Sequence, residues 1–191
     1  MTGVQTCALP ISFVSFGWVV KQIEDFTKPV IAAVNGISAG GGLALALAAD
    51  IRIASENATF SAIFVKRGLV PDCGVSYYLP RLVGISKALE LMWTGDKIDA
   101  KEAERIGMVN KVIVPDRLIQ SAQEFAQSLA RGPSLAIEMI KRMAYTSLKS
   151  DSVITQMAVE DFMQQVCRES EDVIEGVMGF LEKRPPNFKG R

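Results

Sequence analysis

The chain lacks histidine altogether, and this absence removes several common kinds of active site. None of its 191 residues is a histidine. Without an imidazole there can be no Ser-His-Asp or Cys-His catalytic group and no His-ligated metal site. Any chemistry must therefore rest on other groups, such as carboxylates and backbone amides.

Cysteine is scarce as well. The three cysteines, Cys7, Cys73 and Cys167, lie far apart and form no Cys-x-x-Cys motif. A disulfide framework or a zinc site is not expected from such spacing. We predict no metal, and a reducing, cytoplasmic location.

The sequence also has no excess of charge and no long hydrophobic run. Its 21 Lys and Arg balance its 21 Asp and Glu, so the net charge is zero. Nucleic acid or an anionic membrane would find no basic face to bind, and neither is an expected partner. No uninterrupted apolar run is long enough to span a membrane. What the chain does have is 49% hydrophobic residues, enough for a substantial core.

The first eleven residues are unusual. They read MTGVQTCALPI, which resembles the translation of a sequencing-adapter oligonucleotide. We interpret residues 1–11 as a non-native segment that carries no fold information. A signal peptide is the alternative, but a basic start and an Ala-x-Ala cleavage site are both missing. We expect that the natural protein has an N-terminal portion that this chain lacks.

The most informative stretch is residues 28–52, KPVIAAVNGISAGGGLALALAADIR. A β-type run over 30–34 ends at a turn pair, and three glycines (40–42) precede a helix rich in Ala and Leu. The first N–H groups of a helix have no intrahelical partner and lie at the positive end of its dipole. Glycine there lets an oxygen approach them closely. This predicts a site for an anion, or for an oxygen that becomes negative during a reaction. Tight helix–strand packing is the alternative explanation for the glycines.

Two nucleotide-binding motifs come close to this pattern and fail. A P-loop requires Lys where Gly42 stands, although Gly36 and Gly41 have the right spacing. A dinucleotide-binding fingerprint requires glycine where Leu45 stands. Neither kind of phosphate loop is predicted.

The remaining pattern predicts strands that alternate with helices, followed by helices alone. Such an order indicates a parallel sheet covered by helices, an α/β fold. We predict helices over 12–27, from Asp72 through Leu79 and over 87–94, with Ser86 as the cap of the last and a capping box that begins a further helix at Asp99. Strands are predicted over 51–54, 58–60 and 108–114, and only helices after residue 116.

Four segments in order resemble the crotonase (enoyl-CoA hydratase/isomerase) superfamily. They are KPVIAAVNG…GGG…LALAADIRIAS, NATF…GLVPD.G…LPRLVG, the ALEL…TG…A.EA segment and FLEKR…FKGR, and together they cover residues 28–191. The resemblance implies a partial spiral β/α core over 12–115 and a C-terminal helical region over 116–191 that builds trimers, often paired into hexamers. It also implies an acyl-CoA thioester as substrate and no separate cofactor, since CoA is part of the substrate.

The resemblance assigns roles to residues around the glycines. Gly41 matches a family position whose backbone N–H helps to form an oxyanion hole for the thioester oxygen, while the second N–H belongs to the expected missing portion. The two glutamates of family hydratases match Ala44 and Phe64, and neither can move a proton, which counts against a typical hydratase. We expect an apolar acyl pocket, and we assign substrate binding to Ala39, Gly40, Ala44, Phe64, Leu69 and Pro71.

Asp72 matches the base of several family isomerases. The wording VPDCG is most like the isomerase of ring-epoxidised phenylacetyl-CoA. One carboxylate suffices to move a proton between two carbons beside a thioester. The alternative from the residues alone is that Asp72 caps a helix, a routine role for aspartate. We interpret Cys73 as a small packed side chain.

Near the C-terminus, Phe180 and Lys183 match family positions that contact the nucleotide end of CoA, often that of a neighbouring subunit. The alternative is an ordinary amphipathic helix with Phe180 buried and Lys183 solvated. The leading prediction is an acyl-CoA double-bond isomerase. An atypical hydratase or another crotonase activity is one alternative, and a non-catalytic acyl-CoA-binding protein is a second. We expect little activity from the 191-residue chain by itself.

Overall fold

The computed structural model describes residues 13–191, with side chains from Gly17 onward, so the adapter-like segment and Cys7 lie outside the described residues. The chain divides into two compact units. The first contains α1 and residues 32–118, and the second contains residues 26–31 and 119–191. A hydrogen bond of 3.2 Å from Lys141 Nζ to the Lys28 carbonyl fastens the short segment inside the second unit. The predicted division near residue 115 stays a prediction.

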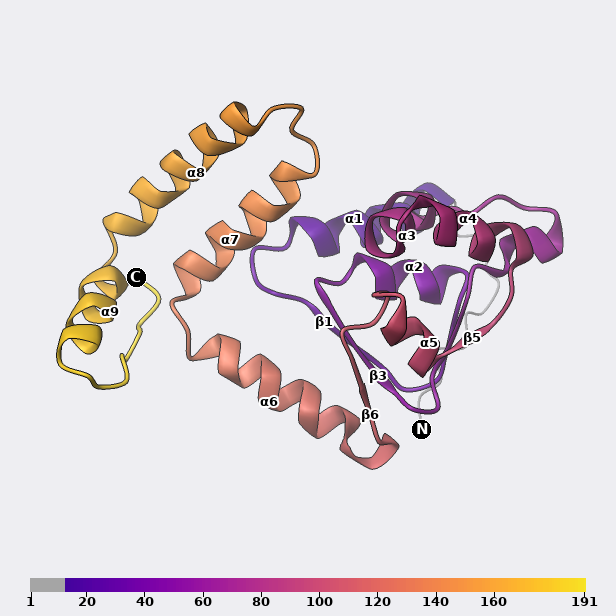
Figure 1. The fold of residues 1–191 in the computed structure, drawn as a ribbon, viewed down its shortest axis with the longest axis horizontal. Helices are drawn as coiled ribbons and strands as arrows, with labels where there is room; N and C mark the ends of the chain where they lie inside the picture. Colours follow the sequence, from indigo (N-terminus) through magenta and orange to yellow (C-terminus); the bar gives the residue numbers. More distant parts are fainter. Residues whose placement is uncertain (1–12) are drawn as a thin grey trace. The chain divides into compact units, whose positions relative to one another are not determined.

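The first unit alternates short strands and helices (Figure 1). Its elements are α1 (Phe13–Asp25), β1 (Ile31–Val34), β2 (Ile37–Ala39), α2 (Gly41–Ala48), β3 (Ile51–Ser55), β4 (Thr59–Ser61), the 3-10 helix η1 (Ile63–Arg67), α3 (Val75–Val83), α4 (Ile85–Thr94), β5 (Ile98–Asp99), α5 (Ala100–Arg105), β6 (Lys111–Ile113) and the 3-10 helix η2 (Pro115–Arg117).

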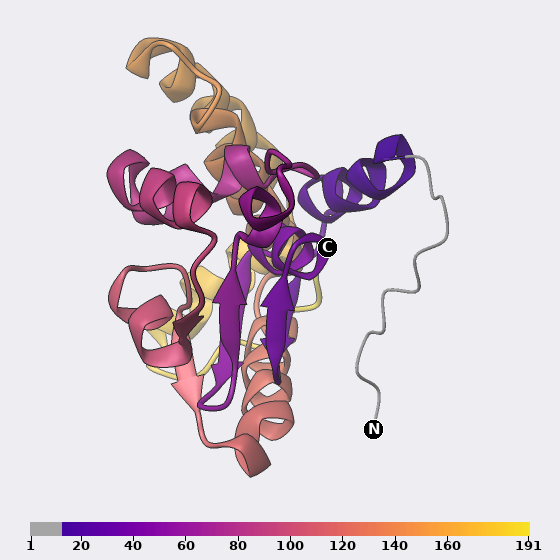
Figure 2. The ribbon, with the colours of Figure 1, turned by 90° about the vertical axis from the view of Figure 1, so that its right-hand side faces the viewer.

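The strands form two small sheets, with orders β1-β3-β6 and β2-β4-β5. Two neighbouring strands of the first unit run side by side in Figure 2. β3 pairs with β6 and β2 pairs with β4 in parallel, whereas β4 and β5 are antiparallel. The predicted α/β class with parallel strand pairs is therefore confirmed.

The core of the first unit is built around α2. This helix reads GGLALALA, and its apolar residues surround it on all sides, which is typical of a helix buried in a core. It packs against α1, β2 and α3. Leu43 and Ala44 share one hydrophobic cluster with Phe60, Val75 and Leu79.

Arg52 fastens β3 to the segment before β6. Its buried side chain donates from Nε to the Met108 carbonyl at 2.7 Å, and its backbone N–H donates to Asn110 Oδ1 at 2.9 Å. The Asn110 N–H donates back to the Arg52 carbonyl, also at 2.9 Å. These contacts give Arg52 a role in holding the fold.

Three local features differ from the sequence prediction or refine it. Strand β2 was not predicted, because three residues are too few for a period-two pattern and the strand depends on pairing with β4. The predicted Ser86 cap is wrong, since α4 begins at Ile85 after Gly84. The predicted Asp99 cap is confirmed by its 2.8 Å hydrogen bond from the Glu102 N–H.

The second unit is helical, as predicted for the chain after residue 116. It contains α6 (Leu118–Ala130), α7 (Ser134–Ser147), α8 (Val153–Arg168) and α9 (Glu171–Leu181). α7 packs against α8. The C-terminal tail returns to α9, where the buried Asp172 carboxylate accepts from the N–H groups of Lys189 at 2.7 Å and Gly190 at 2.9 Å. Within residues 13–191, no helix is both long and apolar enough to cross a membrane.

Candidate active site

The glycine turn stands where β2 ends and α2 begins. Gly40 has φ +54° and ψ −123°, a conformation that glycine adopts far more readily than other residues, and α2 starts at Gly41. The first α-helical hydrogen bond joins the Ala44 N–H to the Gly40 carbonyl at 3.1 Å. The N–H of Gly41 therefore precedes the hydrogen-bonded part of the helix. Its direction is set by the peptide plane between Gly40 and Gly41, and so by the unusual ψ of Gly40.

The alternative that these glycines serve close packing is wrong for two of them. Among the described residues, a Cβ added to Gly40 or Gly42 would meet no heavy atom within 4 Å. Gly40 is thus required for its backbone conformation and not for lack of space. The backbone at the start of α2 is left uncovered by side chains at these positions.

The parallel pairing of β2 with β4 brings the predicted acyl-pocket residues to one edge. Ala39 lies opposite Ser61 in the register, so the segments that follow the two strands leave from the same edge of the sheet. α2 carries Ala44, which is fully buried, and η1 carries Phe64, which is 8% exposed. Both belong to the same hydrophobic cluster. The two positions that matched glutamates are thus apolar and buried.

The loop after η1 joins Leu69 to Phe64. The Leu69 N–H donates to the Phe64 carbonyl at 3.1 Å, after a left-handed turn at Gly68. Leu69 itself is exposed, and Pro71 and Asp72 are half-buried. The structure brings Phe64 and Leu69 together through this bond.

Asp72 does not cap α3. The N-cap residue of α3 is Gly74, and no side-chain hydrogen bond caps the helix there. The interpretation of Asp72 as the cap is therefore wrong. Instead, the Asp72 carbonyl accepts from the Val75 N–H at 3.0 Å across a turn whose central residues, Cys73 and Gly74, have φ +49° and +84°. This turn moves the helix start three residues beyond Asp72, and the local pattern of an aspartate before a helix could not reveal it.

The Cys73 side chain packs against the core cluster. Burial, followed by the hydrogen-bonding and charge effects of Asp72, raises the pKa of the Cys73 thiol to about 11. The thiol is therefore protonated at neutral pH and can donate to the carboxylate. Cys73 is a small packed side chain, as predicted.

Two tyrosines follow on α3. The Tyr78 hydroxyl donates to Glu24 Oε2 of α1 at 3.0 Å, and burial followed by this bond raises the pKa of Tyr78. The Tyr77 ring stacks edge-on against Tyr78, with the Arg81 guanidinium 3.6 Å above its centre. The buried Tyr77 hydroxyl has no hydrogen-bond partner among the described residues.

Phe180 and Lys183 lie in the second unit, at the end of α9 and just beyond it. Phe180 is 82% exposed, so the alternative in which it is a buried helix residue is wrong. Lys183 is exposed and has φ +54°.

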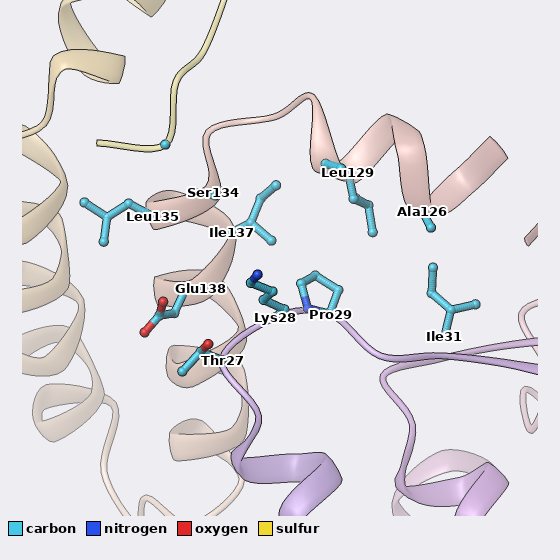
Figure 3. Close-up of a pocket in the computed structure, with 12 residues that line it drawn as sticks. Thr27, Lys28, Pro29, Ile31, Ala126, Leu129, Ser134, Leu135, Ile137 and Glu138 are labelled. Carbon is cyan, nitrogen blue, oxygen red and sulfur yellow. The ribbon is translucent and has the colours of Figure 1, made fainter. Parts of the chain in front are cut away.

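The second unit also contains a cavity of about 400 Å³ (Figure 3). Its lining is mixed, with apolar side chains from α6, α7 and β1, polar side chains that include Lys28 and Glu138, and Gly190 of the C-terminal tail. None of the predicted site residues lines it. The cavity therefore adds no member to the predicted site.

Comparison with known proteins gives a consistent family. The family model described as "Enoyl-CoA hydratase/isomerase" matches residues 15–191. The chain is 40% identical to a 1,2-epoxyphenylacetyl-CoA isomerase of Escherichia coli (strain K12) over 90% of this chain and 65% of that protein. It is 42% identical to a probable enoyl-CoA hydratase of Rhodobacter capsulatus, over 90% of this chain and 66% of that protein. The chain thus spans about two thirds of the length of these curated relatives.

Solved structures agree. A probable enoyl-CoA hydratase/isomerase from Mycobacterium abscessus superposes with a TM-score of 0.90 at 36% identity, covering 94% of this chain and 69% of that one. An enoyl-CoA hydratase from Bacillus anthracis superposes with a TM-score of 0.91 at 34% identity, covering the same shares. The predicted crotonase-type core with a C-terminal helical region is confirmed by these matches. The chain belongs to the enoyl-CoA hydratase/isomerase family.

Proposed function

We propose that the protein is an acyl-CoA double-bond isomerase in which Asp72 is the acid and base. The observation that carries the proposal is that Asp72 is not occupied as a helix cap, while the two positions that matched the hydratase glutamates hold the buried Ala44 and Phe64. An apolar pair cannot split water, whereas a single carboxylate can carry one proton between two carbons. The Escherichia coli relative is named an isomerase, which supports this proposal. Other relatives are named hydratases, which supports the alternative of an atypical hydratase.

The reaction conserves every atom of the substrate. The Asp72 carboxylate removes a proton from a carbon beside the thioester or further along the chain, and the electron pair left behind moves onto the thioester oxygen. The N–H of Gly41 donates to that oxygen, where one such donor lowers the barrier by about 3 kcal/mol. The protonated Asp72 then returns the proton to a different carbon, and the electrons flow back to form the shifted double bond. Ala39, Gly40, Leu69 and Pro71 contact the substrate in this proposal, and CoA is part of the substrate, so no separate cofactor takes part.

Self-association is part of the same proposal. Large apolar side chains are exposed along α8 and α9 of the second unit, namely Val153, Ile154, Met157, Phe162, Ile174, Val177, Phe180 and Leu181. Exposed apolar faces of this kind mark contact surfaces. We infer a homotrimer or hexamer in which Phe180 and Lys183 reach the nucleotide end of a CoA, and light scattering on the purified protein measures the number of subunits.

Replacement of Asp72 by Asn tests the isomerase. The assay uses the chain extended with the upstream sequence of its natural gene, called here the restored protein, and follows the double-bond shift of an enoyl-CoA by absorbance. We expect Asp72→Asn to slow the reaction by about 10²–10⁴-fold, the usual contribution of a general acid–base group. Asp96→Asn is the matched control, because Asp96 is an exposed aspartate paired with Lys66 at 3.0 Å.

Each alternative has its own outcome. Isomerisation at an undiminished rate in Asp72→Asn would remove the proposed base. Hydration without any double-bond shift would favour an atypical hydratase. Binding of CoA thioesters with no turnover would favour a non-catalytic acyl-CoA-binding protein.

A further inference from the structure

The cavity of the second unit has the size and the surface of a ligand site. Its volume of about 400 Å³ lies within the range of small-molecule sites, roughly 300–1,000 Å³. In Figure 3, Leu129 of α6 and Ile31, the first residue of β1, point into the same space, which Pro29 and Ile137 border. All four residues are half-buried, so they present apolar surface that a ligand can still reach. Such a surface favours a hydrocarbon chain.

Lys28 gives this cavity a positive charge. Its side chain lines the cavity, and no carboxylate of residues 13–191 forms an ion pair with it. Glu138 is the only acidic residue among the described residues of the lining, and it is already paired with Arg142 at 2.7 Å. Lys141 Nζ donates to the Lys28 carbonyl at 3.2 Å and brings a second positive charge to the same segment. The positive charges therefore outnumber the negative one, and an anionic group is favoured here.

We propose that this cavity binds a medium-chain carboxylic acid, with the carboxylate at the Lys28 ammonium and the hydrocarbon chain against Leu129 and Ile137. The two ends of such a ligand match the two kinds of surface in the cavity. An alcohol of the same length lacks the charge, an alkylamine carries the wrong one, and a shorter acid has too little chain. No bond is made or broken at this site, and the inference does not rest on Asp72.

Calorimetric titration of the 191-residue chain tests the ligand class, with octanoate as the probe below the concentration at which it forms micelles. Octanoate should bind about tenfold more tightly than octanol, because only the acid can pair with an ammonium group. Hexanoate should bind about tenfold more weakly than octanoate, since it buries two methylene groups fewer. Octylamine should bind no more tightly than octanol.

Lys28→Met tests the charge while it keeps an unbranched side chain of similar length. We expect octanoate to bind this variant about tenfold more weakly and octanol to bind it as it binds the parent. Lys28 is exposed, so the melting temperature without ligand should not change. Lys97→Met is the matched control, because Lys97 is an exposed lysine of the first unit, and it should leave both affinities unchanged.

Ala126→Phe tests the location. Ala126 is an exposed residue of α6 that lines the cavity, so a phenyl ring there occupies ligand space without disturbing the core. Octanoate should bind this variant at least about tenfold more weakly, since a filled site excludes the chain. Gln127→Phe is the control, because Gln127 is the next exposed residue of the same helix and does not line the cavity.

Each outcome decides the inference. Equal affinities of the parent for octanoate and octanol overturn it, as do parental octanoate binding in Lys28→Met and in Ala126→Phe. The restored protein should bind octanoate as tightly as the 191-residue chain does. Loss of binding there would show that upstream sequence, and not a free acid, occupies the cavity. The isomerase assay of Asp72→Asn judges the proposed function separately, since neither result depends on the other.

Discussion

The Tyr78 hydroxyl donates a 3.0 Å hydrogen bond to Glu24 Oε2 and so joins α3 to α1 in the first unit. Both residues are buried, and Glu24 also lies 3.7 Å from Lys21 Nζ. A hydrogen bond to a buried carboxylate is among the stronger ones in a folded protein. The helix that follows the Asp72 turn is therefore fastened to the core by a polar contact as well as by apolar packing.

Tyr78→Phe should destabilise the protein by about 2 kcal/mol, because it removes a donor from a buried charged acceptor. Tyr77→Phe is the matched control and should change the free energy of unfolding by less than about 0.5 kcal/mol, since the buried Tyr77 hydroxyl has no hydrogen-bond partner among the described residues. Urea denaturation at neutral pH measures both values. Equal losses in the two variants would contradict the role given to the Glu24 contact.

The same contact predicts a pH dependence. Burial, and then the bond to Glu24, raises the pKa of Tyr78 above its ordinary value of 10.0. The folded state therefore holds this proton more tightly than the unfolded state does, so the associated stability is complete below pH 10 and is lost as the pH rises above it. Unfolding measured from pH 8 to 11 should show a smaller decline in Tyr78→Phe than in the parent. Parallel curves would show that Tyr78 does not contribute to the decline.

Two glycines of the candidate site differ in a way that can be measured. A Cβ at Gly74 would lie 2.8 Å from Cε2 of Tyr78, whereas a Cβ at Gly68 would meet no atom of the described residues within 4 Å. Both glycines have positive φ, +84° and +68°. Gly68→Ala should therefore cost only the backbone strain, about 1 kcal/mol, and Gly74→Ala should cost about 3 kcal/mol because the tyrosine ring must also move. Thermal unfolding of the two variants checks the order, and a reversed order would contradict the packing of Tyr78 over the turn.

The sequence predicted the elements whose pattern is local. The Ala- and Leu-rich run became the buried α2, the Asp99 cap is present, and the helices after residue 116 are all found. The family resemblance, carried by four ordered segments, predicted the fold that the solved structures share.

The features that the sequence did not predict depend on partners or on backbone angles. β2 exists because it pairs with β4 across 22 positions of sequence, and no pattern within three residues reveals that. The interpretation of Asp72 as a helix cap is wrong because two residues with left-handed backbone angles lie between Asp72 and α3. The alternative of an ordinary amphipathic helix predicted a buried Phe180, because periodicity identifies the apolar face of a helix but does not show what covers that face.

The contact between the C-terminal tail and Glu175 should be lost at acid pH. Glu175 accepts from Arg184 at 2.6 Å and from the Asn187 N–H at 2.7 Å, and these bonds, the arginine first, lower the pKa of Glu175 to about 2. Because the pKa is lowered on folding, the tail contact is complete above the ordinary value of 4.5 and is lost as the pH falls toward 2. The amide shift of Asn187 in NMR spectra should titrate with a midpoint well below 4.5 in the parent and lose that step in Glu175→Gln.

Glu182→Gln provides the control for this titration. Glu182 also contacts Arg184, at 2.6 Å, but the Asn187 N–H donates to Glu175. The variant should therefore keep the step in the Asn187 shift. A midpoint near 4.5 in the parent would contradict the bonded tail.

Gly40 and Gly42 form the pair that bears most directly on the proposed oxyanion donor. The N–H of Gly41 belongs to the peptide plane whose direction follows the ψ of Gly40, −123° at φ +54°. An alanine Cβ at Gly40 meets no heavy atom of residues 13–191 within 4 Å, so its cost is conformational, about 1–3 kcal/mol, and the chain can escape that cost only by rotating the peptide plane. Rotation turns the Gly41 N–H away from the thioester oxygen.

Gly40→Ala should therefore lower the kcat of the restored protein by about 100-fold, the loss expected for one oxyanion donor. Gly42 lies inside the helix, and a Cβ there meets no atom within 4 Å in the part of the chain that the structure describes. Gly42→Ala should therefore keep the kcat and stabilise α2 by up to about 1 kcal/mol. Isomerase assays and thermal unfolding on both variants make the comparison. A Gly40→Ala protein that unfolds earlier but turns over at the parental rate would mean that the Gly41 amide does not hold the reacting oxygen, because its orientation would then have changed without chemical consequence.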